Sequence, residues 1–257
     1  MIEDPRVKKI NFTGSTMVGR IIAEVAGRNL KPVLLELGGK APAIVWEDAD
    51  LELAATECAK GAFVHCGQVC MSTEKILVHK NIQQEFASKL KEKVKRMFGH
   101  RGTLVNKAGV DRNRALVGNA VSKGAEILYG TLQQDHGETG THMSPIVLSG
   151  VNSGMDIYRT ESFGPTVSLI TFSSEDEAVA IANDTEYGLS SAVFTEDLRR
   201  ALRLAKRIES GAVHINGMTV HDETMLPHGG VKSSGFGRFG SGGLDEWVRT
   251  KTVTWRD

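Results

Sequence analysis

Apolar and polar positions along the chain follow two alternating periods. Short apolar runs are typical of strands in the core of a sheet, and longer segments with apolar residues three and four positions apart are typical of amphipathic helices. The predicted strands are residues 10–13, 33–37, 41–46, 75–79, 126–129, 145–148, 166–172, 191–195 and 212–216. One predicted helix begins near residue 16. The other predicted helices cover 51–63, 82–97, 110–122, 175–183 and 198–209. This alternation predicts an α/β protein with mostly parallel sheets.

The first strand and the first helix meet at Gly14, Ser15 and Thr16. Free backbone N–H groups and the helix dipole at such a turn could hold a phosphate. The simpler interpretation, which we favour from this stretch alone, is that Ser15 or Thr16 caps the helix. A P-loop is excluded because Arg20 stands where that motif needs its lysine.

Composition narrows the classes of partner. The 257 residues are 40% hydrophobic, which is enough for one large or two modest domains with a core. Lys and Arg total 31, as do Asp and Glu, so no net charge would attract nucleic acid or an anionic membrane. No apolar run approaches the roughly 20 residues that span a bilayer, and the first residues lack the apolar core of a secretory signal. We therefore expect a cytoplasmic protein without nucleic-acid or membrane partners.

The three cysteines, Cys58, Cys66 and Cys70, fall within one short segment. They cannot link distant parts of the chain, so a disulfide framework is not expected. A zinc site with His65 as fourth ligand is the other interpretation of clustered cysteines. The C-x7-C-x3-C spacing does not fit the usual ligand pairs, and we predict no metal site.

Cys70 is the candidate nucleophile of the chain. It follows an apolar segment and a Gly-Gln pair, and Gly67 leaves room for backbone to approach a ligand. The alternative is that Cys70 is a buried small hydrophobe. Upstream, Glu36 is a lone carboxylate among apolar residues in L-E-L-G-G-K, either a general base or a buried structural partner.

Two further segments carry candidate chemistry. Residues 161–165, E-S-F-G-P, place a carboxylate and an aromatic ring on a turn before a strand, where they can reach a ligand, although a plain turn would need no function. Residues 235–240 match G-x-G-x-x-G. We reject that match as a dinucleotide fingerprint because no strand precedes it and no acidic residue follows in the expected βαβ context.

Five motifs occur in a fixed order: F-T-G-S at Phe12, L-E-L-G-G-K at Leu35, F-x-x-x-G-Q-x-C at Phe63, E-S-F-G-P at Glu161 and G-G-x-K-x-S-G-x-G-R at Gly229. Together they resemble the NAD(P)-dependent aldehyde dehydrogenase superfamily over nearly the whole chain. The chain looks most similar to members that act on aromatic aldehydes such as vanillin or salicylaldehyde.

The resemblance implies roles for named residues. Cys70 would be the catalytic thiol and Glu36 the general base. Glu161 and Phe163 would contact the nicotinamide ribose and ring of NAD, with NADP as a possible alternative. The turn at Gly14 and Ser15 would lie near the pyrophosphate, and Leu37 and Gly38 would also line the cofactor site. The resemblance further implies a small aldehyde substrate and a homo-oligomer.

These roles make chemical sense together. A thiolate attacks the aldehyde to give a thiohemiacetal, and loss of hydride to the cofactor leaves a thioester. The oxyanion formed on the way must be stabilised nearby, and the backbone N–H of Cys70 would supply part of that stabilisation. Glu36 would then activate water to hydrolyse the thioester.

The chain departs from the family pattern in extent. Family members carry a dinucleotide-binding region before F-T-G-S, with an oxyanion asparagine and a ribose-binding lysine, so this chain resembles about the C-terminal half. The resemblance implies a remnant of a Rossmann-like NAD domain at 1–37 and a catalytic domain with a parallel sheet flanked by helices at 38–235. Residues 236–257 would be a C-terminal tail whose strand at 250–255 pairs with a partner subunit.

Two consequences of this departure stay open at the level of sequence. The segment 97–106 looks shortened against the family's usual loop, so its local fold is uncertain from sequence. The alternative to an active enzyme is a catalytically impaired remnant that acts only as a binding or oligomerising module.

Overall fold

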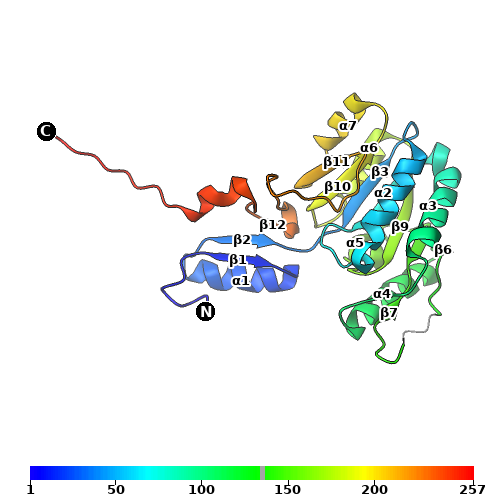
Figure 1. The fold of residues 1–257 in the computed structure, drawn as a ribbon, viewed down its shortest axis with the longest axis horizontal. Coiled ribbons are helices and arrows are strands. Elements are labelled where there is room, and N and C mark those ends of the chain that lie inside the picture. Colours follow the sequence, from blue (N-terminus) through cyan, green and yellow to red (C-terminus); the bar gives the residue numbers. More distant parts are fainter. Residues whose placement is uncertain (134–136) are drawn as a thin grey trace.

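A small three-stranded sheet joins an N-terminal segment of the chain to a C-terminal segment. The computed structural model describes residues 1–133 and 137–257. Strand β1 (Ile10–Thr13) pairs in parallel with β2 (Val33–Glu36), and helix α1 (Thr16–Arg28) connects them (Figure 1). Strand β12 (Gly235–Phe236) returns to pair antiparallel with β2. This return places a C-terminal segment beside Glu36.

A larger sheet forms the body of the molecule. Its seven strands within the described residues have the order β11-β10-β3-β4-β9-β8-β6, and every neighbouring pair is parallel except β6 and β8. The strands are β3 (Ala41–Val45), β4 (Thr73–His79), β6 (Glu126–Tyr129), β8 (Ile146–Ser149), β9 (Thr166–Phe172), β10 (Ser190–Phe194) and β11 (Ala212–Ile215). The prediction of a mostly parallel α/β fold is confirmed.

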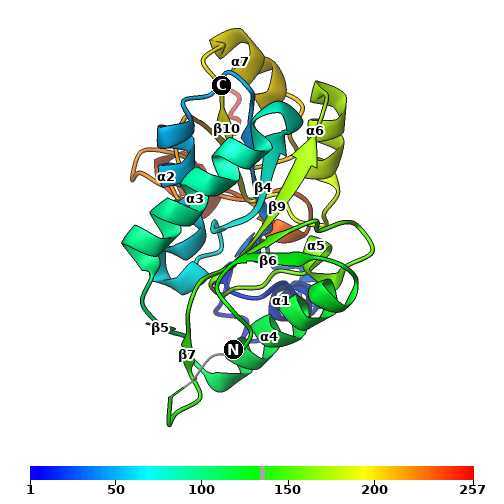
Figure 2. The same ribbon diagram turned by 90° about the vertical axis from the view of Figure 1, so that its right-hand side faces the viewer.

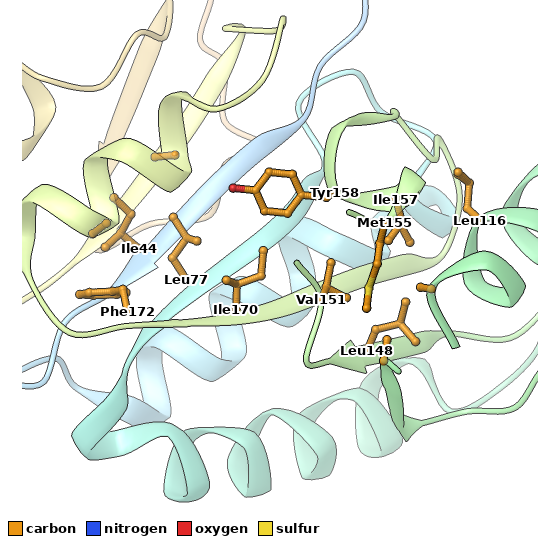
Figure 3. Close-up of a cluster of buried hydrophobic side chains, with 14 of the residues drawn as sticks. Ile44, Leu77, Leu116, Leu148, Val151, Met155, Ile157, Tyr158, Ile170 and Phe172 are labelled. Atoms are coloured by element: carbon orange, nitrogen blue, oxygen red, sulfur yellow. The ribbon is translucent and has the colours of Figure 1, made fainter. Parts of the chain in front are cut away.

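Helices cover both faces of the large sheet (Figure 2). They are α2 (Leu51–Phe63), α3 (Gln83–Phe98), α4 (Lys107–Ser122), α5 (Asp156–Arg159), α6 (Glu175–Asn183) and α7 (Leu198–Ala205). Alternate strand residues point to opposite faces, so each face has its own core. Ile76 and Val78 of β4 pack with α2 and α3, while Leu77 between them packs with α4 to α7 in the cluster of Figure 3.

Shorter elements connect these layers. They are 3-10 turns at Val64–Gly67, Lys80–Ile82, Lys232–Ser234 and Ser241–Trp247, and a two-stranded ladder of β5 (Gly102–Thr103) and β7 (His142–Met143). Strand β5 lies in the segment 97–106, whose fold was uncertain from sequence. Residues 102–103 of this segment are paired with β7.

Helix ends follow local capping chemistry. Ser15 accepts a hydrogen bond from the backbone N–H of Val18 at 3.4 Å, so the capping interpretation of this residue is confirmed. Asp50 caps α2. Helix α4 begins three residues before the predicted start, because Asn106 caps it through Gly109, and α7 ends at Ala205 rather than at 209.

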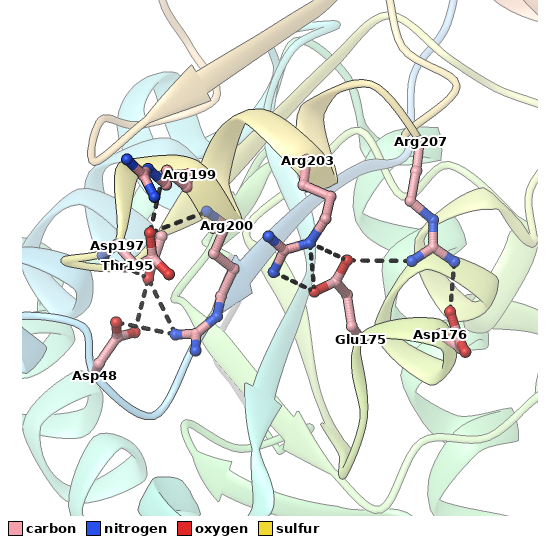
Figure 4. A network of polar contacts seen from close by, with 9 residues as sticks. All are labelled: Asp48, Glu175, Asp176, Thr195, Asp197, Arg199, Arg200, Arg203 and Arg207. Atoms are coloured by element: carbon pink, nitrogen blue, oxygen red, sulfur yellow. Dashed lines mark hydrogen bonds and ion pairs between the residues drawn. The ribbon is translucent and has the colours of Figure 1, made fainter.

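Charged side chains tie α7 to its neighbours (Figure 4). The Arg203 guanidinium donates three hydrogen bonds to the Glu175 carboxylate at the start of α6, and Arg207 contacts Glu175 and Asp176. Arg200 pairs with Asp48 at 2.9 Å. Each exposed pair contributes about 0–1 kcal/mol, so the network orients the helix more than it stabilises the fold.

The C-terminal residues run away from the body (Figure 1). Residues 250–255 form no strand in this single chain, and Val253 and Trp255 are exposed. Alternating side chains alone do not make a strand, because its backbone groups need a neighbouring strand to bond with. Pairing of this segment with a partner subunit stays a prediction.

Lys75 is a buried charge in the middle of this fold. Its residue is completely buried on β4, where Nζ donates to the Asp184 carbonyl at 3.1 Å and lies 4.2 Å from the centre of the Tyr158 ring. Burial and the neighbouring charge of Lys40 lower the pKa of Lys75 to about 7.

Replacing Lys75 with methionine is expected to stabilise the protein below pH 7. The unfolded lysine binds its proton up to about pH 10.4, whereas the folded one loses it near pH 7. The unfolding free energy of the wild type should therefore rise with pH between these two values. Lys75→Met removes this slope and gains roughly 1–4 kcal/mol at pH 6. Urea unfolding from pH 6 to 10 measures both effects.

The matched control is Lys91→Met on the exposed face of α3. It should keep the wild-type slope. An unchanged slope in Lys75→Met would show that this lysine keeps its ordinary pKa in the folded protein.

Candidate active site

Cys70 follows a tight, irregular turn at the end of α2. His65, Cys66 and Gly67 are consecutive residues with positive φ, at 54°, 57° and 68°. Such conformations cost about 1–3 kcal/mol each for side chains other than glycine and gather at functional sites. A β-carbon on Gly67 would lie 2.1 Å from the carbonyl oxygen of Gly164. The expectation that Gly67 makes room for a ligand is wrong, because a neighbouring loop occupies that space.

Gln68 fixes this turn against the next segment of the chain. Its Nε2 donates to the carbonyl oxygens of His65 at 3.0 Å and Thr103 at 3.2 Å. Its Oε1 accepts from the backbone N–H of Val105 at 2.8 Å. The side chain therefore connects the loop that carries Cys70 to the β5 segment.

Glu36 ends β2 at the junction of three segments. Its carbonyl oxygen accepts from the N–H of Gly14 at 3.0 Å, and Gly235 of β12 is its strand partner on the other side. The residue is only 3% exposed. Its Oε1 has no hydrogen-bond partner, and the nearest charged group is Nε2 of His228 at 3.5 Å. A buried carboxylate oxygen without a partner is available to bind water or substrate.

A cavity of about 520 Å³ opens on one side of Cys70 and Glu36. All eight site residues predicted from the sequence line it, and it also touches four that were not predicted. The lining comprises Thr13, Gly14, Ser15, Glu36, Leu37, Gly38, Gln68, Val69, Cys70, Arg112, Glu161 and Phe163. The tertiary structure therefore gathers the separate motifs around one space.

A second cavity of about 400 Å³ opens on the other side. It is lined by Thr13, Glu36, Cys70, Asp222, Glu223, Thr224, Leu226, His228, Phe239 and Gly240. Only Thr13, Glu36 and Cys70 belong to both cavities. A thiol and a carboxylate between two cavities can act on a molecule bound in one while a second molecule occupies the other.

Comparison with known families agrees with this arrangement. The model of the aldehyde dehydrogenase family matches residues 1–253. The chain belongs to this family. Since that match covers almost every residue, both cavities lie within the part of the chain that the family describes.

Three relatives place the chain within the family. It is 44% identical to a vanillin dehydrogenase of Pseudomonas fluorescens, over 99% of this chain and 54% of that protein. The crystal structure of a salicylaldehyde dehydrogenase from Pseudomonas putida G7 complexed with salicylaldehyde is 42% identical, with a TM-score of 0.90 over 95% of this chain and 52% of that one. An NAD-dependent aldehyde dehydrogenase from Sinorhizobium meliloti is 39% identical, with a TM-score of 0.92 over 97% and 51%.

These matches cover only part of each relative. It spans about half the length of the relatives that it matches. In the part of the chain that the structure describes, no helix is both long enough and apolar enough to cross a membrane.

The loop that carries Glu161 and Phe163 is held by a buried carboxylate. Glu74 accepts from the backbone N–H of Ser162 at 2.8 Å, from its hydroxyl at 3.0 Å and from the N–H of Phe163 at 3.1 Å. Glu74 also pairs with Lys40, and both side chains are almost fully buried. Phe163 has a φ of 46°, which the two backbone bonds hold in place.

Glu161 lies close against the glycines of L-E-L-G-G-K. Its Oε1 accepts from the N–H of Gly39 at 2.7 Å, and a β-carbon on Gly38 would lie 2.8 Å from its Oε2. Burial and the charge of Glu74 raise the pKa of Glu161 to about 7. Both glycines are needed here, because a β-carbon on Gly39 would also meet the carbonyl oxygen of Cys70 at 2.2 Å.

The thiol of Cys70 is electrostatically disfavoured as a thiolate. Burial, followed by the negative charge of Glu36, raises the pKa of Cys70. Burial also raises the pKa of Cys58, which is enclosed in the core. The proton of Cys70 must therefore pass to a base, for which Glu36 is placed, before the sulfur attacks.

Sequence reasoning missed the second cavity as a space, although Glu36 and Cys70, which line it, were predicted. Most of its other residues come from 222–228 and 239–240, within or just before the glycine-dense segment, which carries the fifth family motif and the rejected dinucleotide fingerprint but no predicted site residue. In the structure, Gly235 lies against the backbone of Leu35, where a β-carbon would meet its carbonyl oxygen at 2.0 Å. That segment packs against β2 rather than holding a phosphate. Local sequence carries no signal for this packing, because the strand that the segment contacts, β2, lies about 200 residues away in the chain.

Proposed function

We propose that this chain carries the thiol and the base of an NAD(P)-dependent aldehyde dehydrogenase that oxidises an aromatic aldehyde to its carboxylic acid. The observation that carries the proposal is the position of Cys70 and Glu36 between the two cavities. The identity to vanillin and salicylaldehyde dehydrogenases supports the substrate class. Phe239 and Leu226 supply apolar surface for a ring in the second cavity, and Asp222 and Glu223 supply acceptors for a ring hydroxyl.

The first cavity fits the nicotinamide end of the cofactor. The Glu161 carboxylate can accept from ribose hydroxyls, Phe163 offers an aromatic edge, and the N-terminus of α1 at Ser15 favours a phosphate. Leu37 and Gly38 form one wall of this cavity. Gly38 lies so close to Glu161 that a β-carbon on this glycine would crowd the carboxylate. When bound, NAD or NADP would supply the hydride acceptor.

The residues of the chain would then act in sequence. Glu36 takes the proton of Cys70, and the sulfur attacks the aldehyde carbon. The backbone N–H of Cys70 donates to the developing oxyanion. After oxidation the acyl group remains on sulfur as a thioester. Glu36 first releases the proton that it took from Cys70, and then takes a proton from the water that hydrolyses the thioester.

We propose three regions for these tasks: 1–37 for part of the cofactor site, 38–235 for catalysis and 236–257 for oligomer contacts. A second candidate function is a module that binds or oligomerises with little catalysis. Exposed apolar residues on α1 favour it, since Met17 and Ile21 are 70% and 56% exposed. A three-stranded sheet offers little surface for the adenosine half of a dinucleotide.

One experiment separates the two functions. Purified chain is assayed for p-nitrophenyl acetate hydrolysis and for NADH formation with benzaldehyde and salicylaldehyde, and Cys70→Ala is the blank. We expect esterase turnover that depends on Cys70, together with weak NADH formation, because positioning of the nicotinamide is worth orders of magnitude in rate. Strong NADH formation at micromolar NAD would reject the module. Equal esterase rates in Cys70→Ala would reject Cys70 as the nucleophile.

A further inference from the structure

His228 is a fixed feature of the second cavity. Its backbone N–H donates to the carbonyl of Phe239 at 3.1 Å, and the N–H of Phe239 donates back to the carbonyl of His228 at 2.7 Å. These two bonds form an isolated antiparallel bridge. The backbone of His228 is therefore held as firmly as that of a strand residue, although it lies in a loop.

The imidazole lies between Glu36 and solvent. Its Nε2 is 3.5 Å from Oε1 of Glu36, and the side chain is 18% exposed against 4% for that of Glu36. A separation of 3.5 Å is an ion-pair contact rather than a hydrogen bond. Contacts of catalytic groups are often long without ligand and shorten in the complex. Oε1 of Glu36 has no hydrogen-bond partner, so besides the Cys70 thiol His228 is the titratable side chain placed to exchange a proton with the Glu36 carboxylate.

Charges around the ring favour its protonated form. The contact with Glu36 outweighs burial and raises the pKa of His228. Asp222 from the preceding loop also favours the imidazolium, and Arg238 from the following segment opposes it. Arg238 is turned partly away, since its Nη1 donates to the carbonyls of Gly230 and Gly237. A raised pKa makes His228 a better acceptor for a proton from Glu36.

We propose that His228 is the proton-exchange partner of Glu36, carrying the proton of each hydrolytic turnover from the buried carboxyl to solvent in the second cavity. The inference rests on the proposed function, because it assigns a role within the same site. It makes His228 a positioning residue that acts through Glu36 and touches no reacting atom itself.

The step balances in atoms and charge. Water adds to the thioester carbon while one of its protons passes to Glu36, the C–S bond breaks, and sulfur leaves with the electron pair as thiolate. The neutral imidazole of His228 then takes the proton from the Glu36 carboxyl at Nε2. The resulting imidazolium gives a proton to solvent, and Glu36 is a carboxylate again. The Cys70 thiolate attacks the next substrate molecule or takes a proton from solvent. Without this exit, the proton stays on a side chain that has almost no contact with water.

The test uses His228→Ala, which leaves space for a free imidazole in a cavity of about 400 Å³. With p-nitrophenyl acetate, the initial burst reports acylation of Cys70 and the steady state reports hydrolysis. We expect a burst of wild-type size, a steady-state rate roughly 10- to 100-fold lower, and recovery when imidazole is added. His214→Ala is the control, because it removes a half-buried imidazole from β11 that lines neither cavity.

The outcomes separate the two proposals. A burst with an unchanged steady state in His228→Ala, or no greater recovery with imidazole than in His214→Ala, overturns the role of His228. Absence of any Cys70-dependent burst in the wild type overturns the proposed function instead. In that case, or if His228→Ala does not fold, the pKa of His228 is followed by NMR in the wild type and in Glu36→Gln. We expect it to fall without the carboxylate, and an unchanged value overturns the contact.

Discussion

Glu36→Gln is expected to slow hydrolysis of the acylated enzyme by about 10²–10³-fold. Acylation of Cys70 continues, because without the charge of Glu36 the thiol loses its proton to solvent more readily. Glutamine keeps the volume of the buried side chain but cannot accept a proton from water. The measurement is a burst of p-nitrophenol followed by a very slow steady state, with an acetyl adduct on Cys70 detected by intact mass. Glu126→Gln, at an exposed position of β6, is the control and should behave as wild type.

The same variant has a second expected effect on Cys70. Glu36 raises the pKa of the thiol, so removing its charge should speed alkylation by iodoacetamide near pH 8. Cys66, which is partly exposed, serves as the internal reference. If acetyl turnover and alkylation of Cys70 both stay at wild-type rates, Glu36 is not the base of this site.

Glu74→Ala is expected to destabilise the protein by about 3–5 kcal/mol. The change leaves Lys40 as an unpaired buried charge and removes the acceptor for the N–H groups of Ser162 and Phe163. This is a large share of a total that is usually about 5–15 kcal/mol. Urea unfolding measures the loss, with Glu85→Ala on the exposed face of α3 as the control.

A double variant separates charge from packing. Lys40→Met combined with Glu74→Met removes both charges and should recover part of the stability lost in Glu74→Ala, because no buried charge is left alone. The loop with Glu161 should still be displaced, because the acceptor for the N–H groups of Ser162 and Phe163 is still missing. A loss within 1 kcal/mol of the Glu85→Ala control would contradict a structural role for Glu74.

Local sequence determined most of the secondary structure. Periodicity of apolar residues and capping by Ser15 and Asp50 act within a few positions, so they can be recognised without the fold. Some differences fell at ends: α4 begins earlier because of Asn106, and α7 ends earlier than its periodicity suggested. The others are short elements that were not predicted, namely α5, β5, β7 and β12. The eight predicted site residues came from motif resemblance rather than from periodicity, and the structure brings all of them to one cavity.

Tertiary structure decided what depends on distant partners. The second cavity exists because residues 222–240 fold back on β2, nearly 200 residues away in the chain, and no local pattern encodes that contact. Gly67 illustrates the same point, since its neighbour is Gly164 rather than a ligand. The protonation of Cys70 depends on its burial beside Glu36. Sequence alone identified the thiol and the carboxylate, whereas their electrostatic coupling, and the contact between Glu36 and His228, arise only when the chain encloses them in a low dielectric.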